Sequence, residues 1–159
     1  MIRPATIQDF SFVYECYMHP QVNPYLLYEF MDTESFQPIF DELVQQGSKY
    51  IYSRDNENIG MFKLIPLQHR SHHIAYLGGL AIHPSFFGRG EGLTMLQEIV
   101  ALAGEKGFLR IELTVGITNE KAVKLYEKVG FEKEGVLRKL THLISEQRFV
   151  DEVMMSFLF

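Results

Sequence analysis

The stretch from Leu77 to Leu93 constrains the fold more than any other segment of this chain. An apolar run up to Ile82 leads into a loop with glycine at alternate positions, and an amphipathic pattern follows directly; the glycines are Gly88, Gly90 and Gly92. Glycine permits backbone conformations that a Cβ forbids, so several N–H groups of such a loop can converge on one anion. The free amides and positive dipole end of a helix starting near Gly90 add to this attraction, and Arg89 could add a charged contact. The segment predicts a strand, an anion-binding loop and a helix.

Two familiar phosphate motifs do not fit this loop. No Lys-Ser or Lys-Thr follows the glycines, as a P-loop requires, and a dinucleotide pattern read from Gly88 meets Leu93 where its third glycine belongs. ATP and NAD are therefore poor candidates. From this loop alone, a glycine-rich turn without a ligand is an equally good interpretation.

The loop resembles that of the GCN5-related N-acetyltransferase (GNAT) family, in which Arg/Gln-x-x-Gly-x-Gly/Ala holds the pyrophosphate of acetyl-CoA. The matching residues run from Phe87 to Gly92. Phe87 stands where the family usually has Gln or Arg. This departure removes one side-chain donor and leaves the backbone donors in place.

A second segment carries the same resemblance. The residues from Asn119 to Phe131 are similar to the family signature Asn-x-x-Ala-x-x-Leu-Tyr-x-x-x-Gly-Phe. Two motifs in the right order and at the right distance are more specific than either motif alone.

Composition indicates one soluble globular domain, residues 1–159, with 47% hydrophobic and 22% charged residues. No apolar run approaches the roughly 20 residues of a membrane span, and the N-terminus lacks a signal-peptide pattern, so we expect a cytoplasmic protein without membrane contact. The formal charge of −5 argues against a nucleic-acid partner. A single cysteine, Cys16, excludes an internal disulfide and a cysteine-based zinc site, and its apolar surroundings predict a buried core residue.

Hydrophobic periodicity and breaker residues predict one strand, two helices, three strands, a helix, a strand, a helix and two strands. The expected helices lie near residues 6–17, 34–46, 90–104 and 119–130, and the expected strands near 2–5, 50–52, 60–67, 74–82, 109–115, 131–143 and 147–159. The three strands before the glycine loop should form an antiparallel meander, and the last two a hairpin. This order matches the GNAT fold, an α/β (α+β) class with a central mixed, mostly antiparallel sheet of about seven strands flanked by about four helices.

The resemblance implies acetyl-CoA as co-substrate and no metal. Its pantetheine arm would lie beside the strand that ends at Ile82, and Gly78-Gly79 in that strand indicates a bulge or the close approach of another backbone. The residues expected to contact the cofactor are Leu80, Ala81, Ile82, Phe87, Gly88, Arg89, Gly90, Glu91, Gly92, Leu93, Asn119 and Tyr126.

Catalytic roles are expected for Tyr126 and Glu112. The resemblance implies that Tyr126 protonates the departing thiolate; reference pKa values make this transfer uphill by only about 2 kcal/mol. Without the motif, Tyr126 would be interpreted as a half-buried aromatic of an amphipathic helix. Many relatives carry Glu-x-Glu-Val on the preceding strand, but here Thr114 replaces the second carboxylate. Glu112 is therefore the expected general base, directly or through water, and a solvated or ion-paired strand residue is the alternative. His83 could also titrate near neutrality, although a structural role is favoured.

The acceptor is expected between the first two helices and the later strands, with Tyr28 and Glu29 binding a primary amine of a small molecule or a protein N-terminus. A packed loop is the alternative for this stretch. The histidines His69, His72 and His73 lie in a polar turn without a carboxylate, which favours solvent exposure over zinc binding.

Two other function classes stay open. Phe87 and Thr114 could mark a catalytically silent acyl-CoA-binding or sensor module. The C-terminal Phe157-Leu158-Phe159 could seat in a partner chain, and either a monomer or a homodimer is expected.

Overall fold

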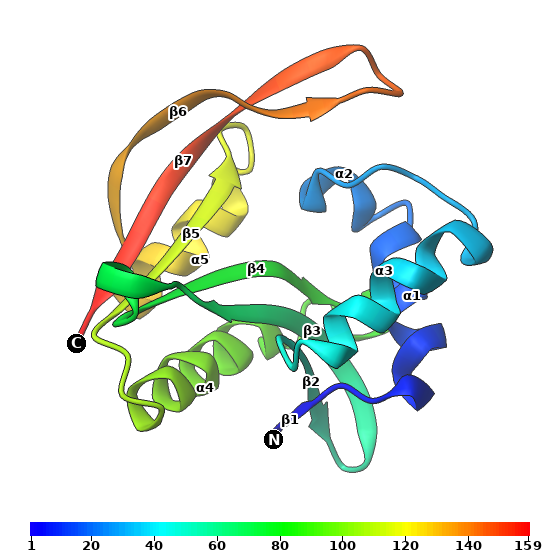
Figure 1. Cartoon of the computed structure of the whole chain (residues 1–159), viewed down its shortest axis with the longest axis horizontal. Helices are drawn as coiled ribbons and strands as arrows, with labels where there is room; N and C mark the ends of the chain where they lie inside the picture. Colours follow the sequence, from blue (N-terminus) through cyan, green and yellow to red (C-terminus); the bar gives the residue numbers. More distant parts are fainter.

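A seven-stranded mixed sheet forms the centre of the computed structural model, which describes residues 1–159 (Figure 1). The strands are β1 (Ile2–Pro4), β2 (Lys49–Arg54), β3 (Glu57–Pro66), β4 (Ile74–Ile82), β5 (Arg110–Gly116), β6 (Glu132–Leu143) and β7 (Arg148–Leu158). Their order in the sheet is β1-β2-β3-β4-β5-β7-β6, and only β4 and β5 pair in parallel. The predicted meander β2-β3-β4 and the terminal hairpin β6-β7 are confirmed.

Five helices flank the sheet, one more than the sequence predicts. They are α1 (Phe10–Met18), α2 (Asn23–Leu26), α3 (Thr33–Gln45), α4 (Glu91–Glu105) and α5 (Glu120–Val129). The short α2 lies where Asn23-Pro24 predicts a break. Pro24 occupies the first turn of α2, where its missing N–H removes no helical hydrogen bond.

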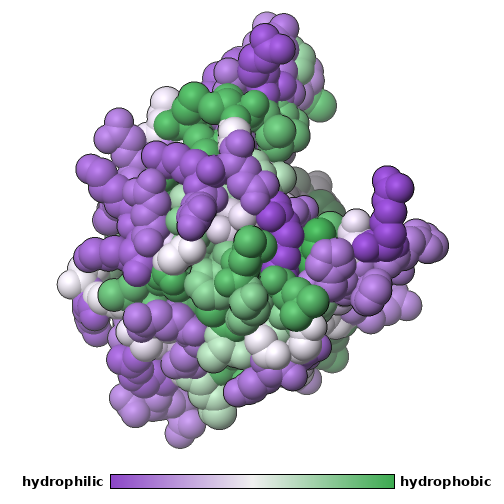
Figure 2. All heavy atoms as spheres, turned by 90° about the vertical axis from the view of Figure 1, so that its left-hand side faces the viewer, coloured by the Kyte–Doolittle hydropathy of each residue, from purple (hydrophilic) through white to green (hydrophobic).

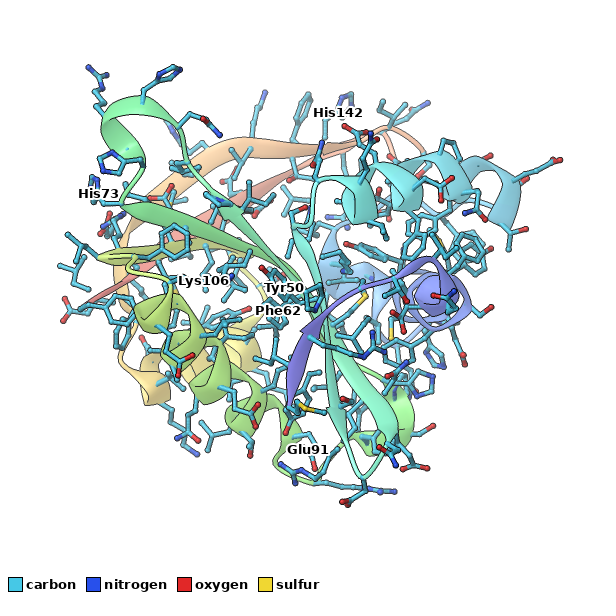
Figure 3. The ribbon with its side chains drawn as sticks, turned by 60° about the horizontal axis from the view of Figure 1, so that its bottom comes forward. Tyr50, Phe62, His73, Glu91, Lys106 and His142 are labelled. Carbon is cyan, nitrogen blue, oxygen red and sulfur yellow. The ribbon has the colours of Figure 1, made fainter.

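Residue alternation along the strands separates two cores. Phe62 and Leu64 of β3 belong to the larger core, which includes side chains of α4 and α5. Met61 points to the opposite face and packs in a second core with side chains of α1 and α3, such as Phe36. The sheet therefore has one face covered by α4 and α5 and another covered by α1 and α3. Within the larger core, Tyr50 stacks on Phe62 with ring centroids 5.1 Å apart (Figure 3).

The N-terminal turn is held by one carboxylate. The predicted Thr-x-x-Asp motif is present, with Asp9 accepting hydrogen bonds from the backbone N–H and the hydroxyl of Thr6. It opens a 3₁₀ turn, Ile7–Asp9, that continues into α1. Arg3 donates two further hydrogen bonds, at 2.7 and 2.8 Å, and this partner lowers the pKa of Asp9 to about 2.

The C-terminal aromatic rings pack on this chain itself. The Phe159 ring lies against Gly104 of α4, where an added Cβ would come within 2.9 Å of it, and Phe157 packs against Phe131 with centroids 5.6 Å apart. Figure 2 shows hydrophobic atoms gathered on the face at the left of Figure 1, where the C-terminus lies. Seating of this end in a partner chain stays a prediction.

No helix of this fold combines the length and apolar character needed to cross a membrane. No three His, Cys, Asp or Glu side chains converge as metal ligands, and His69, His72 and His73 lie at a turn.

Lys49 is the most deeply buried charged residue, with 1% of its surface exposed. Its Nζ lies 3.2 Å from the Tyr17 hydroxyl and 4.6 Å from the centroid of the Tyr17 ring, and no carboxylate pairs with it. Burial lowers the pKa of Lys49 well below its ordinary value, and the positive charge of Lys63 acts in the same direction. The fold therefore disfavours the charged form of Lys49.

We expect the substitution Lys49→Met to stabilise the protein at neutral pH by at least ~1 kcal/mol, the scale of a poorly satisfied buried polar group. Between the lowered pKa of folded Lys49 and the ordinary value of about 10.4, the unfolded chain binds more protons, so the stability due to this residue rises with pH. The variant should lose that rise. Urea unfolding between pH 6 and 10 measures it, with exposed Lys128→Met as the control. An unchanged pH dependence would contradict the assignment.

Candidate functional site

The parallel strands β4 and β5 stay paired over only three residues. The pairs are Ile74 with Arg110, Ala75 with Ile111 and Tyr76 with Glu112. Beyond Tyr76 the two strands diverge, and the edge of β4 that faces β5 has no strand partner. Backbone polar groups on this edge need another partner, from water or a ligand.

A β-bulge in β4 lies at the start of this divergence, as Gly78-Gly79 predicts. Gly79 and Leu80 together oppose Phe62 of β3, and Gly79 has a φ of +54°. An added Cβ at Gly79 would lie 2.7 Å from the Tyr17 hydroxyl. Both the positive φ and this close approach require glycine.

A cavity of about 630 Å³ occupies the space between the diverging strands and α1, α2, α5 and the β6-β7 hairpin. Most of its wall is apolar, which suits a small-molecule site. Of the residues expected to contact the cofactor or the acceptor, the cavity is lined by Leu80, Ala81, Ile82, Phe87, Asn119, Tyr126 and Tyr28.

The glycine loop presents a row of unused donors beside this cavity. The backbone N–H groups of residues 88–92 donate to no backbone or side-chain acceptor, whereas the N–H of Leu93 already donates to the Gly90 carbonyl at 3.1 Å. Gly88 and Gly90 have φ values of +75° and +79°, which turn the chain into the first turn of α4. Five consecutive free amides at a helix N-terminus can bind an anion. The Arg89 guanidinium lies 5.3 Å from the Phe86 ring centroid, at the edge of the loop.

Glu91 fixes this loop through its side chain. Its carboxylate is buried and accepts hydrogen bonds from the Tyr52 hydroxyl and from Arg54, both at 3.0 Å. Figure 3 shows Glu91 at the beginning of α4, close to the end of the β2-β3 hairpin. Of the polar groups of Glu91, its side chain is therefore engaged within the protein and its backbone N–H is available to a ligand.

The helix α5 brings Asn119 and Tyr126 to the cavity. The Asn119 side chain caps the helix by accepting the N–H of Ala122 at 3.2 Å. Tyr126, two turns later, is 8% exposed. Burial raises the pKa of its phenol, with a smaller contribution from neighbouring Tyr76, so Tyr126 is protonated at neutral pH.

Glu112 is outside the cavity and has a charged partner. Its carboxylate lies 3.1 Å from Nε of Arg110, whose other nitrogens contact Glu134 at 2.6 and 2.9 Å. This network joins β5 to β6 at the closed end of the strand divergence. Thr114 does line the cavity, and its hydroxyl lies 3.3 Å from the hydroxyl of Tyr76.

Tyr28 and Glu29, the two residues expected to bind the acceptor, make contacts in different parts of the structure. The Tyr28 ring lines the cavity and packs against Tyr17 with centroids 4.8 Å apart. Glu29 instead accepts hydrogen bonds from Ser145 and from the backbone of Ile144 at 2.6 Å, and these bonds lower its pKa. Glu29 thus ties the α2-α3 loop to the tip of the β6-β7 hairpin, which reaches toward α2 in Figure 1.

His83 also lies outside the cavity lining. Its Nδ1 accepts the N–H of Ser85, its Nε2 lies 3.1 Å from Glu15, and its ring stacks on Phe12. These contacts give His83 a structural role at the start of the glycine loop.

Tyr17, Lys63 and Glu152 are among the polar cavity residues that the sequence analysis did not predict. For Lys63 and Glu152, the sequence contains a pattern that could have identified them. Lys63 interrupts the apolar run Gly60–Pro66, and Glu152 sits between apolar positions of the last strand. A charged residue inside an apolar strand that is expected to be buried marks a paired or functional site.

Known proteins share this architecture. The model of the acetyltransferase (GNAT) family matches residues 10–131. An uncharacterized N-acetyltransferase, MJ1207 of Methanocaldococcus jannaschii, is 31% identical over 65 residues, which are 41% of this chain and 29% of that protein. The spermidine N(1)-acetyltransferase of Escherichia coli K12 is 25% identical over 146 residues, covering 86% of this chain and 74% of that enzyme.

Among solved structures, the spermidine N-acetyltransferase of Vibrio cholerae in complex with CoA and spermine superposes with a TM-score of 0.84 at 21% identity. The match covers 99% of this chain and 94% of that one, which confirms the fold predicted from the sequence. Because the family model covers most of the chain and the related enzymes are named N-acetyltransferases, this protein belongs to the GNAT family of acetyltransferases.

Proposed function

We propose that this protein transfers an acetyl group from acetyl-CoA to a primary amine of a small molecule or a protein N-terminus. The observation that carries the proposal is the row of free backbone amides at residues 88–92, next to a cavity that opens between β4 and β5. The spermidine-acetylating relatives support a small amine as acceptor.

The free amides fit the pyrophosphate of CoA. A diphosphate needs several donors in one concave backbone segment, which the glycine loop supplies without a side chain from position 87. Phe87, 46% exposed at the cavity wall, can contact an apolar part of the cofactor instead. Hydrogen bonds from Tyr52 and Arg54 of β2 hold the Glu91 side chain, which restrains this part of the loop from the side away from the ligand.

The unpaired edge of β4 fits the pantetheine arm. Beyond Tyr76 this edge offers backbone donors and acceptors over Gly78–Ile82, where an extended amide chain can pair as an added strand. An N–H group at the bulge can also stabilise the oxyanion that develops on the thioester carbonyl.

Tyr126 is suited to act as the general acid. As the neutral amine nitrogen bonds to the thioester carbon, the carbon–sulfur bond breaks and the sulfur leaves as a thiolate, while the nitrogen loses one proton to solvent, from which the Tyr126 phenol is later reprotonated. Tyr126 keeps its proton at neutral pH and lies in the cavity wall, so it can donate that proton to the sulfur. For Glu112, the contact with Arg110 and the position outside the cavity favour a structural role over that of general base.

A catalytically silent acyl-CoA sensor is the second candidate, because Thr114 occupies the position of a carboxylate in many relatives and is hydrogen-bonded to Tyr76. Release of CoA thiol over a panel of amines separates the two. Tight acetyl-CoA binding without turnover on any amine would support the sensor.

The Gly90→Ala variant should bind CoA about tenfold more weakly, because a side chain is strained at a φ of +79° and one amide contact of about 1.4 kcal/mol would be misplaced. Gly47→Ala is the matched control, with a φ of +63° and open space around the added Cβ. Both variants should lose roughly 1 kcal/mol of stability. Calorimetric titration with CoA should show a weaker affinity only for the Gly90 variant, and equal affinities would contradict the cradle.

The Tyr126→Phe variant should lower kcat by about 10²- to 10⁴-fold, with acetyl-CoA affinity nearly unchanged, because only the transferable proton is removed. Tyr50→Phe, a phenol change on β2 outside the cavity, should leave kcat as it is. Steady-state rates of thiol release measure both. An unaltered kcat in the Tyr126→Phe variant would contradict the proposal that Tyr126 is the general acid.

A further inference from the structure

Two unpaired charges line the cavity on one face of the sheet. Lys63 alternates with Phe62 and Leu64, and Glu152 lies next to Val153; these neighbours belong to the core shared with α4 and α5. Lys63 and Glu152 therefore point to the opposite face, toward α1 and α2. Both line the cavity there, together with Tyr17 and Tyr28.

Glu152 is buried and has no cationic partner. Only 5% of its surface is exposed, and its one side-chain hydrogen bond comes from the hydroxyl of Thr141 on β6. No Lys, Arg or His lies within ion-pair distance. Apart from Thr141, the other cavity residues of the hairpin are apolar: Leu137, Leu140 and Met154. A cationic group of a ligand in the cavity would stabilise a carboxylate in such a position.

Lys63 is half-buried and likewise has no carboxylate partner. Its Cε lies 3.4 Å from the position of a Cβ at Gly79, so the side chain extends along the bulge of β4. No ion pair or hydrogen bond involving its ammonium group is formed within the chain. Burial lowers the pKa of Lys63, and a carboxylate of a ligand would favour its charged form.

The two charges lie on opposite sides of the strand divergence. Lys63 belongs to β3, which pairs with β4 on one side, and Glu152 belongs to β7, where it pairs with Gly116 of β5 on the other side. A ligand in the cavity between them meets a cation at one wall and an anion at the other. A molecule with both complementary charges would satisfy the two residues together.

We propose that the acceptor is an amino acid, an amine that also carries a carboxylate, with its amine directed to Glu152 and its carboxylate to Lys63. This inference rests on the proposed acetyltransferase function and narrows its substrate. A polyamine would place a further cation near Lys63, which like-charge repulsion disfavours. The chain thus differs in acceptor chemistry from its spermidine-acetylating relatives.

The test compares matched acceptors with the CoA-loaded protein. Glycine, β-alanine, 4-aminobutanoate, 6-aminohexanoate and L-leucine are titrated calorimetrically, alongside alkylamines of the same length and spermidine. At least one amino acid should bind tenfold or more tightly than its alkylamine, and acetylation rates measured in parallel should follow the same order. The length of the best amino acid reports the separation of the two charges.

Two variants assign the charges. Lys63→Met should abolish the advantage of the amino acid over its alkylamine and leave alkylamine affinity unchanged, whereas Glu152→Gln should weaken both tenfold or more. Lys128→Met and Glu105→Gln, exposed and outside the cavity, should change neither. Thermal unfolding checks that each variant is folded.

Three results would overturn the inference: alkylamines or spermidine binding as well as every amino acid, no binding by any amino acid, or an equal loss for both ligand kinds in Lys63→Met. Binding is measured without turnover, so failure of the acetyltransferase proposal gives a different result. In that case amino acids bind but no acetylated product forms, or CoA itself does not bind.

Discussion

The early separation of β4 from β5 is the constraint on which the cavity depends. After the pair Tyr76–Glu112, the facing edges of the two strands lose their hydrogen-bond partners. Each strand is held on its other side, β4 by β3 and β5 by β7 over its whole length, so the gap cannot close by sliding of one strand. The bulge at Gly79 and the Tyr17 hydroxyl packed against it maintain the divergence. An unpaired strand edge inside a domain is costly unless a ligand or water satisfies it.

The glycine loop, at one end of that gap, holds a second set of backbone groups without partners. Its free amides and the start of α4 concentrate partial positive charge at one point. Glu91 would counter this charge if it faced the loop, but its carboxylate turns away to Tyr52 and Arg54. Side-chain orientation therefore leaves the loop electropositive although its sequence contains an acidic residue. The proposed binding of an anion at the loop and of a thioester in the gap both rest on this arrangement.

Much of the fold could be predicted from sequence, because strand alternation, glycine stops and two separated motifs agree with one another. The Gly78-Gly79 bulge was predictable too, since glycine inside an apolar strand often marks a bulge or the close approach of another group. The partner that each side chain takes was not predictable from the sequence. Glu29 was expected to bind the acceptor, and its contact with Ser145 joins residues 116 positions apart, which no local pattern reveals. Glu112 was expected as the base, with a solvated or ion-paired strand residue as the alternative, and the structure shows it ion-paired to Arg110, two residues away on the same strand face.

The two charged cavity residues, Lys63 and Glu152, show the same limit of prediction from sequence. Lys63 and Glu152 reach the same cavity, without pairing with each other, only when β3 and β7 are placed on either side of the divergence. Each residue alone is one charge in an apolar strand, a signal of a buried site that does not say which residues share it. The strand order and the burial of the two side chains are needed to see that both charges line one cavity.

Amide chemical shifts during titration with CoA test the central claim most directly, because they report on each backbone N–H separately. The largest shifts should fall on residues 88–92 and on β4 beyond Tyr76, with little change in β1 and β2. Shifts confined to other surfaces, or none at millimolar CoA, would contradict the account.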